Sequence, residues 1–479
     1  MNKVIVRNSI YNIIYKVFSV IFPLVTSSYV SRILLAEGVG KVAYAQSIVT
    51  YFVTLSSLGI PQYGIKAIAQ SESSRDGQSK TFSELFIINL VSTVLWCAVY
   101  YTLINQMLYF ADRRALFNTM GLLLILNIFN VDWFYQGIEK YGYIATRSMI
   151  VKLLSLISMF VFVRTSDDYI NYGLILCIAT AGNYLYNAAN LRKYVGIRVK
   201  GIDLARHLKP VLILLVSAVA TEIYTMLDTV MIEHIHGEAY VGYYSNAVKV
   251  VRVIYTLVIA MVSTFYPQIS IYLNEGDYSE SNKLLSIGTK IILLFSVPLA
   301  MGAFVLSDSV VLILFGADFY SSIATLRILS VLICVFSLAY FLGHIILMST
   351  CNEKKILKAT IAGAVFNFCA NSLLIPPLKH NGAAIASVLA ELIVTAILLY
   401  NGKKFFKLNI GSRFVFSVIA SSAAMALAVA IVAAMMEDVV LKMIVGTGIG
   451  ILTYGIGLLI GKNEILMDLL SAIARRFRR

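Results

Sequence analysis

Long apolar runs, separated by short polar breaks, follow one another along almost the whole chain. About fourteen of them approach or exceed the roughly 20 residues that a helix needs to cross the hydrocarbon core of a bilayer. A continuous helix satisfies its own backbone hydrogen-bonding groups in lipid, so each run predicts one membrane-spanning helix. The predicted spans are residues 10–35, 42–60, 82–105, 115–135, 148–163, 170–190, 210–234, 241–266, 286–306, 325–348, 359–376, 382–402, 414–436 and 443–460.

A short pattern occurs twice and indicates an internal repeat. The second span follows Val39-Gly40 and ends at Pro61-Gln62, and the eighth follows Val241-Gly242 and ends at Pro267-Gln268. Each half holds an even number of spans, so both copies cross the membrane in the same orientation. Transporters built from such repeats bind the substrate between two lobes and rock them for alternating access.

The expected fold is therefore an all-α integral membrane protein, in which two six-helix lobes surround a central cavity and two further helices follow. The most basic break lies between Arg192 and Lys209 and separates the lobes. The predicted division is residues 1–200 for helices 1–6, 201–405 for helices 7–12, and 406–479 for helices 13–14 with a basic cytoplasmic tail. The stretch 307–324 is only half apolar and is a candidate for a partly re-entrant segment.

Composition agrees with a membrane protein, and the charge reports topology. Apolar residues make up 59% of the chain, charged residues 13%, and the mean hydropathy is +0.82. The net charge of +14 would suit nucleic acid, but 26 of the 39 Lys and Arg lie in alternate breaks that include both termini. This asymmetry follows the positive-inside rule and predicts that both termini are cytoplasmic. The first apolar run is too long for the core of a signal peptide.

Polar side chains line one face of the first, seventh and eighth spans at helical spacing. Ionisable residues are costly in a membrane and usually face a cavity or a partner. Lys249 and Arg252 are neighbours well inside the eighth span, and with Lys16 they predict a water-filled cavity of basic character. Two alternatives remain open. The Ser and Thr residues of these faces can instead pack helices together, and Lys16 and Lys152 can reach the interface.

A basic cavity favours an anionic substrate, since ammonium and guanidinium groups bind phosphate through charge-assisted hydrogen bonds. Carboxylates within or near the spans can take up a proton or sodium ion for coupling, or can serve as fixed counter-ions; they are Asp228, Glu222, Glu391 and Asp132. Arg32 lies about 160° from Lys16 on an ideal helix and so faces away, unless the helix bends at Pro23.

Nothing in the sequence indicates a catalytic or metal site. The five cysteines are scattered without a CxxC pair, and His234 and His236 point to different sides of their helix. The stretch Gly457–Asn463 is one residue short of a phosphate loop and lacks its final Ser or Thr. We therefore expect no enzyme and no cofactor, with coupling to a proton or sodium gradient or to the membrane potential as the open alternatives.

Several segments resemble one family across nearly the whole chain. Residues 132–141 read DWFYQGIEKY and are followed by Arg147-Ser148. This segment is similar to the "DW-x-x-QG-x-E…RS" segment of the Wzx-type polysaccharide flippases, in the multidrug/oligosaccharidyl-lipid/polysaccharide exporter superfamily. Further similarity lies in 31–40, 58–65, 227–231 and 241–245, although Lys66 stands where many members have Arg.

The resemblance implies the movement of an undecaprenyl-pyrophosphate-linked oligosaccharide from the inner to the outer leaflet of a bacterial plasma membrane, for O-antigen, capsule or other polysaccharide. It also makes Arg32 a cavity candidate, since related peptidoglycan-precursor flippases have an Arg near this point. The expected pyrophosphate and cavity residues are Lys249, Arg252, Arg32, Lys16 and Lys152. Expected partners are the lipid-linked oligosaccharide and membrane lipids, with a polysaccharide polymerase and a chain-length regulator as further candidates, and no nucleic acid.

Three other functions stay open at this point. A drug or metabolite exporter of the same superfamily would more naturally present carboxylates to cationic substrates. A membrane-embedded glycan polymerase or ligase would usually need an extended loop to hold its sugar substrates. No loop between the predicted spans exceeds roughly twenty residues. A binding scaffold without transport is the third.

Overall fold

The computed structural model describes residues 3–72, 74–198, 200–350, 352–406 and 410–468, with side chains from residue 22 onward except that of Asn274. These residues form helices and no strand, which confirms the all-α prediction. Contacts divide the chain into two compact units, Met1–Gly242 (unit 1) and Tyr243–Arg479 (unit 2), and each is described by itself.

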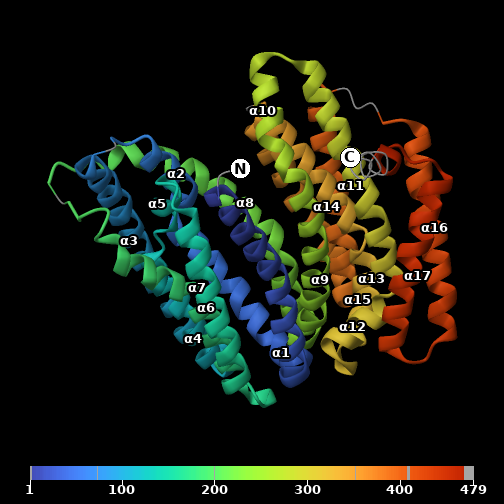
Figure 1. Ribbon diagram of the computed structural model, residues 1–479. Helices are drawn as coiled ribbons and strands as arrows, with labels where there is room; N and C mark the ends of the chain where they lie inside the picture. Colours follow the sequence, from blue (N-terminus) through green and yellow to red (C-terminus); the bar gives the residue numbers. More distant parts are fainter. Residues whose placement is uncertain (1–2, 73, 199, 351, 407–409, 469–479) are drawn as a thin grey trace. The chain divides into compact units, whose positions relative to one another are not determined.

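Unit 1 is formed by eight α-helices and three short 3-10 helices within its described residues, and α9 begins at its end (Figure 1). They are α1 (Lys3–Ser57), α2 (Ile60–Ala69), α3 (Arg75–Gln106), η1 (Leu108–Arg113), α4 (Arg114–Leu126), η2 (Asn127–Phe129), α5 (Asp132–Gly137), α6 (Tyr141–Phe162), η3 (Ser166–Asp168), α7 (Tyr169–Leu191) and α8 (Ala205–His236).

The helix α9 continues into unit 2, where the remaining helices follow. They are α9 (Glu238–Val262), η4 (Ser263–Phe265), α10 (Tyr266–Glu275), α11 (Tyr278–Val305), α12 (Ser307–Phe315), η5 (Ala317–Phe319), α13 (Ser322–Leu329), α14 (Leu332–Tyr340), η6 (Phe341–Leu347, a π-helix), α15 (Glu353–Gly402), α16 (Ser412–Met435) and α17 (Val439–Ile460).

The apolar helices make this a multi-pass membrane protein. Among the described residues, 9 helices are long and apolar enough to cross a membrane, or up to 10 if the pair Ser322–Leu329 and Leu332–Leu347, bent by 41°, is one span. The predicted number of fourteen is not confirmed. Part of the difference lies in α1 and α15, which each contain two predicted spans and are interrupted by a residue of positive φ, Leu35 (58°) and Lys379 (56°).

A buried aromatic cluster organises one end of unit 1. We call this end the basic end; residues 61–72, 74–81, 136–147, 191–198 and 200–209 lie there. The ring of Phe82 stacks on Trp133 with centroids 5.6 Å apart. Gly64 of α2 lets this indole approach, because a Cβ there would lie 2.5 Å from the Trp133 ring. Trp133 is 3% exposed, so α2, α3 and α5 share one core.

The two copies of the repeated Val-Gly pattern meet in unit 1. A Cβ on Gly40 would lie 1.7 Å from the carbonyl oxygen of Glu238, and one on Gly242 would lie 2.1 Å from that of Ala36. The start of α9 and the second part of α1 therefore cross at a distance that only glycine permits. The glycine of each copy of the pattern is therefore needed for the close packing of these two helices.

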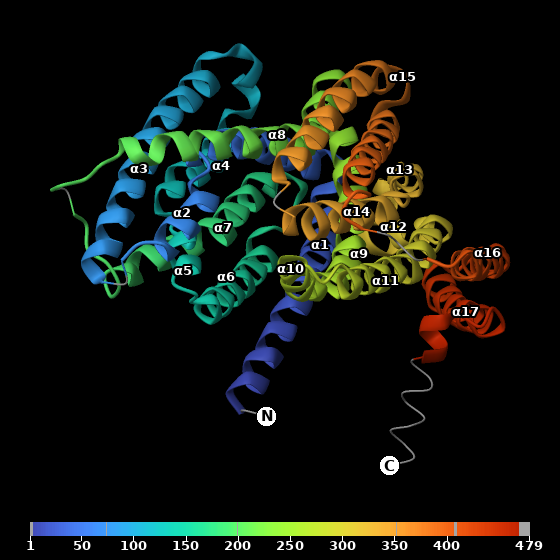
Figure 2. The ribbon, with the colours of Figure 1, turned by 90° about the horizontal axis from the view of Figure 1, so that it is seen from above.

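The compact units do not follow the predicted lobes. The helix α8, which the sequence analysis assigns to the second lobe, packs along α1 and α2 and belongs to unit 1. The predicted boundaries at residues 200 and 405 rest on the basic break and the repeat rather than on contacts, and they stay a prediction. In unit 2, α16 and α17 pack side by side, and both contact α11 (Figure 2).

Candidate functional site: charged residues of the apolar helices

In unit 2, the helix α9 presents two basic side chains on successive turns. Lys249 is half-buried and donates a hydrogen bond to Oδ1 of Asn246 over 3.2 Å. Asn246 is 0% exposed, so its amide is fixed within the unit. Arg252 is exposed and lies close enough for its charge to act on Lys249. The pair predicted from i,i+3 spacing therefore exists as a cationic surface on one helix.

A buried carboxylate of α15 lies near this cationic surface. Glu391 is 3% exposed, and its charge and that of Arg252 both act on the phenol of Tyr255. One turn before Glu391, Ser387 forms a hydrogen bond of 3.0 Å with the hydroxyl of Tyr244 on α9. The structure thus brings Arg252 of α9 and Glu391 of α15 close to the same tyrosine, with Lys249 one turn before Arg252 on α9.

In unit 1, two other predicted carboxylates lie on α8 and face α1. Asp228 is 5% exposed and Glu222 is half-buried, and the charges of both act on Tyr51 of α1. The two helices pack closely here, since the Ser47 hydroxyl lies 3.7 Å from the sulfur of Met226. Asp228 and Glu222 therefore form one group of carboxylates in unit 1, whereas Glu391 belongs to unit 2.

The other three cations predicted to line the cavity lie on α1 and α6 rather than on α9. Lys152 on α6 is half-buried, and its ammonium lies 5.8 Å from the ring centroid of Phe22, a cation–π distance. Arg32 is exposed on α1, which continues through Pro23 and is interrupted at Leu35 instead. The side chain of Lys16 lies outside the described residues.

Asp132, predicted as a coupling residue or counter-ion, has a buried arginine as its partner. Arg147 is 4% exposed, and its Nη1 and Nη2 lie 3.2 and 3.3 Å from Oδ1 and Oδ2 of Asp132. Asn187 of α7 bonds to both side chains, and Nε of Arg147 donates to Oδ1 of Asn183 over 3.0 Å. This network joins α5, α6 and α7, and it connects the acidic and basic residues of the family-like segment.

Sequence reasoning missed a buried carboxylate at the basic end. Glu84 on α3 is 0% exposed and accepts hydrogen bonds from Asp203 N (2.8 Å) and from Nη2 of Arg206. Its Oε2 also lies 3.0 Å from Nε2 of His207, whose Nδ1 lies 2.9 Å from the Tyr63 hydroxyl. Because an ionised carboxylate can only accept, the histidine donates from Nε2. An acidic residue at the start of an apolar run was the available signal.

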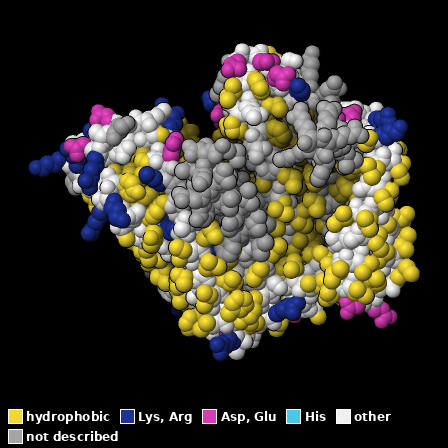
Figure 3. All heavy atoms as spheres, viewed as in Figure 1, with side chains coloured by type: hydrophobic (Ala, Val, Ile, Leu, Met, Phe, Trp, Pro, Cys, Tyr) yellow, Lys and Arg dark blue, Asp and Glu magenta, His cyan; other side chains and the backbone are white. Residues whose placement is uncertain are grey.

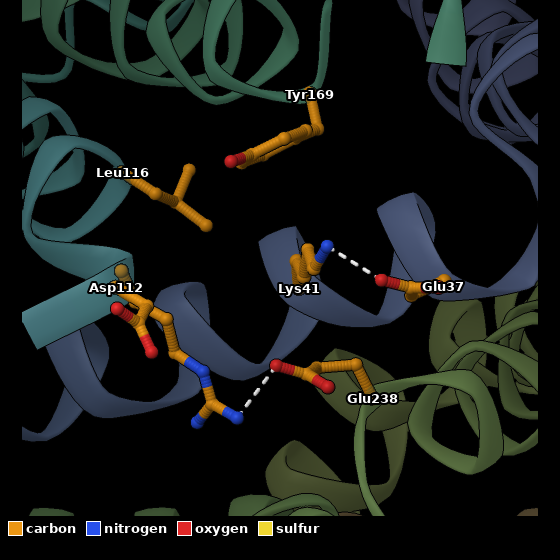
Figure 4. A pocket seen from close by; sticks show the side chains of 7 residues that line it. Glu37, Lys41, Asp112, Leu116, Tyr169 and Glu238 are labelled. Atoms are coloured by element: carbon orange, nitrogen blue, oxygen red, sulfur yellow. Dashed lines mark hydrogen bonds and ion pairs between the residues drawn. The ribbon is translucent and has the colours of Figure 1, made fainter. Parts of the chain in front are cut away.

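A second missed cluster lies at the opposite end of unit 1. Arg113 contacts Glu233 (2.5 Å) and Glu238 (2.7 Å), and the Tyr109 hydroxyl donates to Glu233 over 2.5 Å. Glu233 is 4% exposed, so these groups compensate a buried charge. Arg113 and Glu238 border a cavity of about 280 Å³ (Figure 4), lined by Glu37, Lys41, Asp112, Arg113, Leu116, Tyr169 and Glu238.

Lys41 in this cavity shows how the mixed charges act on one another. Its ammonium lies 2.6 Å from Oε1 of Glu37 and 5.1 Å from the ring centroid of Tyr169. Burial alone would lower the pKa of Lys41, but the Glu37 carboxylate, together with Tyr169 and Glu238, outweighs burial and raises that pKa. No group of three His, Cys, Asp or Glu among the described residues is arranged to hold a metal ion.

Comparison with curated proteins finds relatives that match most of the chain. Two curated relatives are putative O-antigen transporters, from Escherichia coli K12 (24% identical over 406 residues, 82% of this chain and 95% of the relative) and Shigella dysenteriae (22% over 387 residues, 79% and 95%). They are transporters and not enzymes, which confirms that expectation.

Solved structures show the fold. The lipid II flippase MurJ, in an inward closed conformation, matches with a TM-score of 0.75 at 16% identity, over 96% of this chain and 99% of that protein. A MATE multidrug resistance transporter in an inward-facing conformation matches with a TM-score of 0.64 at 14% identity, over 80% and 93%. A family model described as polysaccharide biosynthesis protein matches residues 5–273. That match covers more than half of the chain, which therefore belongs to the polysaccharide biosynthesis protein family.

Proposed function

We propose that this protein is a flippase that moves undecaprenyl-pyrophosphate-linked oligosaccharide units across a bacterial plasma membrane by alternating access. Family membership supports a role in polysaccharide assembly, and relatives named as O-antigen transporters support a glycan substrate. The observation that carries the proposal is the cationic surface of Lys249 and Arg252 on an apolar helix. A membrane protein keeps such a charged pair only where it has a use.

The chemistry of the substrate fits this surface. The pyrophosphate of this substrate is esterified at both ends and is a compact dianion, and ammonium and guanidinium groups bind it by charge-assisted hydrogen bonds. These bonds are stronger away from bulk water. In the proposal the glycan meets the polar faces of the first, seventh and eighth predicted spans, and the lipid tail stays in the bilayer. Arg32, Lys152 and Lys16 are secondary candidates for the same anion.

A coupling ion acts in this proposal through the carboxylates. Glu391 lies near Arg252, and its protonation or its binding of sodium would change the net charge that the pyrophosphate meets. Asp228 and Glu222 form the second candidate group, whereas Asp132 acts as the counter-ion of Arg147. We further propose that the basic end of unit 1 and both termini face the cytoplasm, as the positive-inside rule predicts.

The test replaces Arg252 with Ala in a strain that depends on this protein for its surface glycan. We expect loss of surface glycan and accumulation of the lipid-linked unit, with normal protein levels in the membrane. The matched control is Arg413→Ala, which removes an exposed arginine at the start of α16. Full glycan assembly by the Arg252 variant would contradict the proposal. Altered drug efflux with unchanged glycan would instead favour an exporter.

A further inference from the structure

The basic end of unit 1 carries an apolar pocket that the proposed transport route does not use. It has a volume of about 770 Å³ and lies between α3, η2 and the segment that follows α7. Its wall is mostly apolar, with one arginine, and is formed mainly by Phe82, Phe86, Phe129, Val131, Leu191 and Ile197. Ile197 is 71% exposed, so the pocket has an open, apolar entrance.

A basic pocket adjoins the apolar one. It has a volume of about 570 Å³ and is lined by Lys80, Ile197, Arg198, Lys200 and Gly201. Ile197 lines both pockets, so the two lie side by side at that residue. Figure 3 shows Lys and Arg side chains gathered over this loop, beside a flank rich in hydrophobic side chains. The result is a site with one charged and one apolar compartment.

Hydrogen bonds hold the segment after α7 in place. The backbone N–H groups of Gly196 and Arg198 donate to the hydroxyls of Ser79 (3.1 Å) and Ser83 (2.7 Å) on α3. The Arg75 guanidinium donates to the carbonyl of Arg192 over 3.1 Å. These bonds preform the part of the apolar pocket's wall that follows α7, which lowers the ordering cost of binding a ligand.

The charge of this site is positive despite one acidic neighbour. Nη2 of Arg198 lies 3.3 Å from Oδ2 of Asp76, and their side chains are 50% and 80% exposed. An ion pair this exposed is weak and leaves the guanidinium available to a better anion. Lys80 and Lys200 add two further charges beside it.

We propose that this site binds one anionic phospholipid of the leaflet at the basic end. The phosphate would lie on Lys80, Arg198 and Lys200, and an acyl chain would fill the apolar pocket beyond Ile197. Basic pockets beside membrane helices recognise anionic headgroups in this way. The apolar compartment distinguishes a lipid from free phosphate, which would leave that compartment empty. The inference goes beyond the proposed transport function and does not depend on it.

The test measures lipid retention by the purified full chain, using native mass spectrometry with added dioleoylphosphatidylglycerol or dioleoylphosphatidylcholine. We expect preferential retention of phosphatidylglycerol, reduced about tenfold in the double variant Lys80→Ala/Arg198→Ala. The matched control is Lys354→Ala/Lys358→Ala, which removes two exposed lysines from unit 2 and should retain the lipid like the wild type. Equal losses in both variants would overturn the proposal.

Two further arms separate the possible sources of the phosphate. Ala189→Phe should fill the apolar pocket and weaken retention, and Ile197→Ser, at an exposed position, should do so without disturbing folding. Glycerophosphoglycerol and inorganic phosphate should compete poorly, because neither has an acyl chain; equal competition would overturn the proposal. Displacement by undecaprenyl pyrophosphate at lower concentration than by phosphatidylglycerol would also overturn it, in favour of a polyprenyl lipid.

Discussion

The basic end of unit 1 and the α9 surface of unit 2 both carry charges on apolar helices, but they treat those charges differently. Glu84 is 0% exposed and accepts from Asp203 N, Arg206 and His207. Lys249, in contrast, is only half-buried, and its hydrogen bond goes to the neutral amide of Asn246. Arg252 beside it is exposed.

The difference separates a structural charge from a functional one. A buried charge with several fixed partners stabilises packing only as long as every partner stays, and removal of one member is severe. A half-buried cation whose hydrogen bond goes to a neutral amide, with a second cation beside it, contributes little to folding and keeps its capacity for an anionic ligand. The same reasoning treats Asp132 with Arg147 as a structural pair, since Arg147 is 4% exposed and bonded on several sides.

The largest effect on stability is expected for Glu84→Ala. The variant leaves the buried His207 and the guanidinium of Arg206 without their acceptor, which typically costs about 3–5 kcal/mol. Thermal unfolding of the purified protein should show a strongly lowered midpoint, or the protein should fail to accumulate. The control Glu72→Ala removes an exposed carboxylate and should unfold like the wild type. Wild-type stability of the Glu84 variant would contradict the assignment of Glu84 as a structural charge.

A smaller loss is expected for Arg113→Met. Glu233 would keep Tyr109 but lose its guanidinium partner, at a cost of about 2 kcal/mol, since Arg113 is itself partly exposed. The double variant Arg113→Met/Glu233→Gln should recover much of this stability, because it removes the uncompensated charge as well. The single variant Glu233→Gln completes the comparison. If the loss of stability in the double variant equals the sum of the losses in the two single variants, Arg113 and Glu233 do not interact as described.

Still smaller is the expected effect of Asp308→Asn, where Asp308 accepts from Nζ of Lys442 over 2.9 Å. Burial would raise the pKa of Asp308, but Lys442 and the Ser309 N–H lower it below 3.8. The ionised form therefore stabilises the fold at pH values above 3.8, and this contribution disappears as the pH falls through the lowered pKa. Since the pair is partly exposed, we expect less than about 1 kcal/mol.

The measurement compares the unfolding midpoints of wild type and Asp308→Asn from pH 7 downward. The difference should be constant near neutrality and should vanish only below pH 3.8. A difference that already disappears at pH 5 would show that another group is responsible.

The least change in stability is expected for Lys249→Met, which replaces a half-buried cation by an apolar chain of similar length. Folding should change by less than about 1 kcal/mol, because an exchange of this kind also removes a desolvation cost. Transport should nevertheless fall by about tenfold or more, the value of one lost charge-assisted bond. Strong destabilisation, with transport per folded molecule unchanged, would assign Lys249 to structure.

The sequence predicted what depends on one helix and missed what depends on two. Apolar runs identify helices, and i,i+3 spacing is enough to place Lys249 beside Arg252. The partners of Glu84 and Glu233 lie about 120 residues away, and no local period reports such a pairing. The meeting of Gly40 with the start of α9 is of the same kind, although the repeated Val-Gly pattern marked both positions.

Two sequence expectations depend on more than hydropathy. The number of spans differs in part because hydropathy does not show whether two neighbouring apolar runs belong to one helix, as they do on either side of Leu35 and of Lys379. For Arg32, ideal-helix geometry predicts the face opposite Lys16, and resemblance predicts the cavity; α1 passes Pro23 without interruption. Arg32 and the other cavity residues stay predictions that only substrate measurements address.

The most direct test of the central claim is a flipping assay in proteoliposomes with a fluorescent undecaprenyl-pyrophosphate-linked oligosaccharide. Wild type and the double variant Lys249→Met/Arg252→Met are compared at equal amounts of folded protein. The account predicts rapid movement of the lipid by the wild type and a rate near that of empty vesicles for the variant. Equal rates for the two proteins would contradict it.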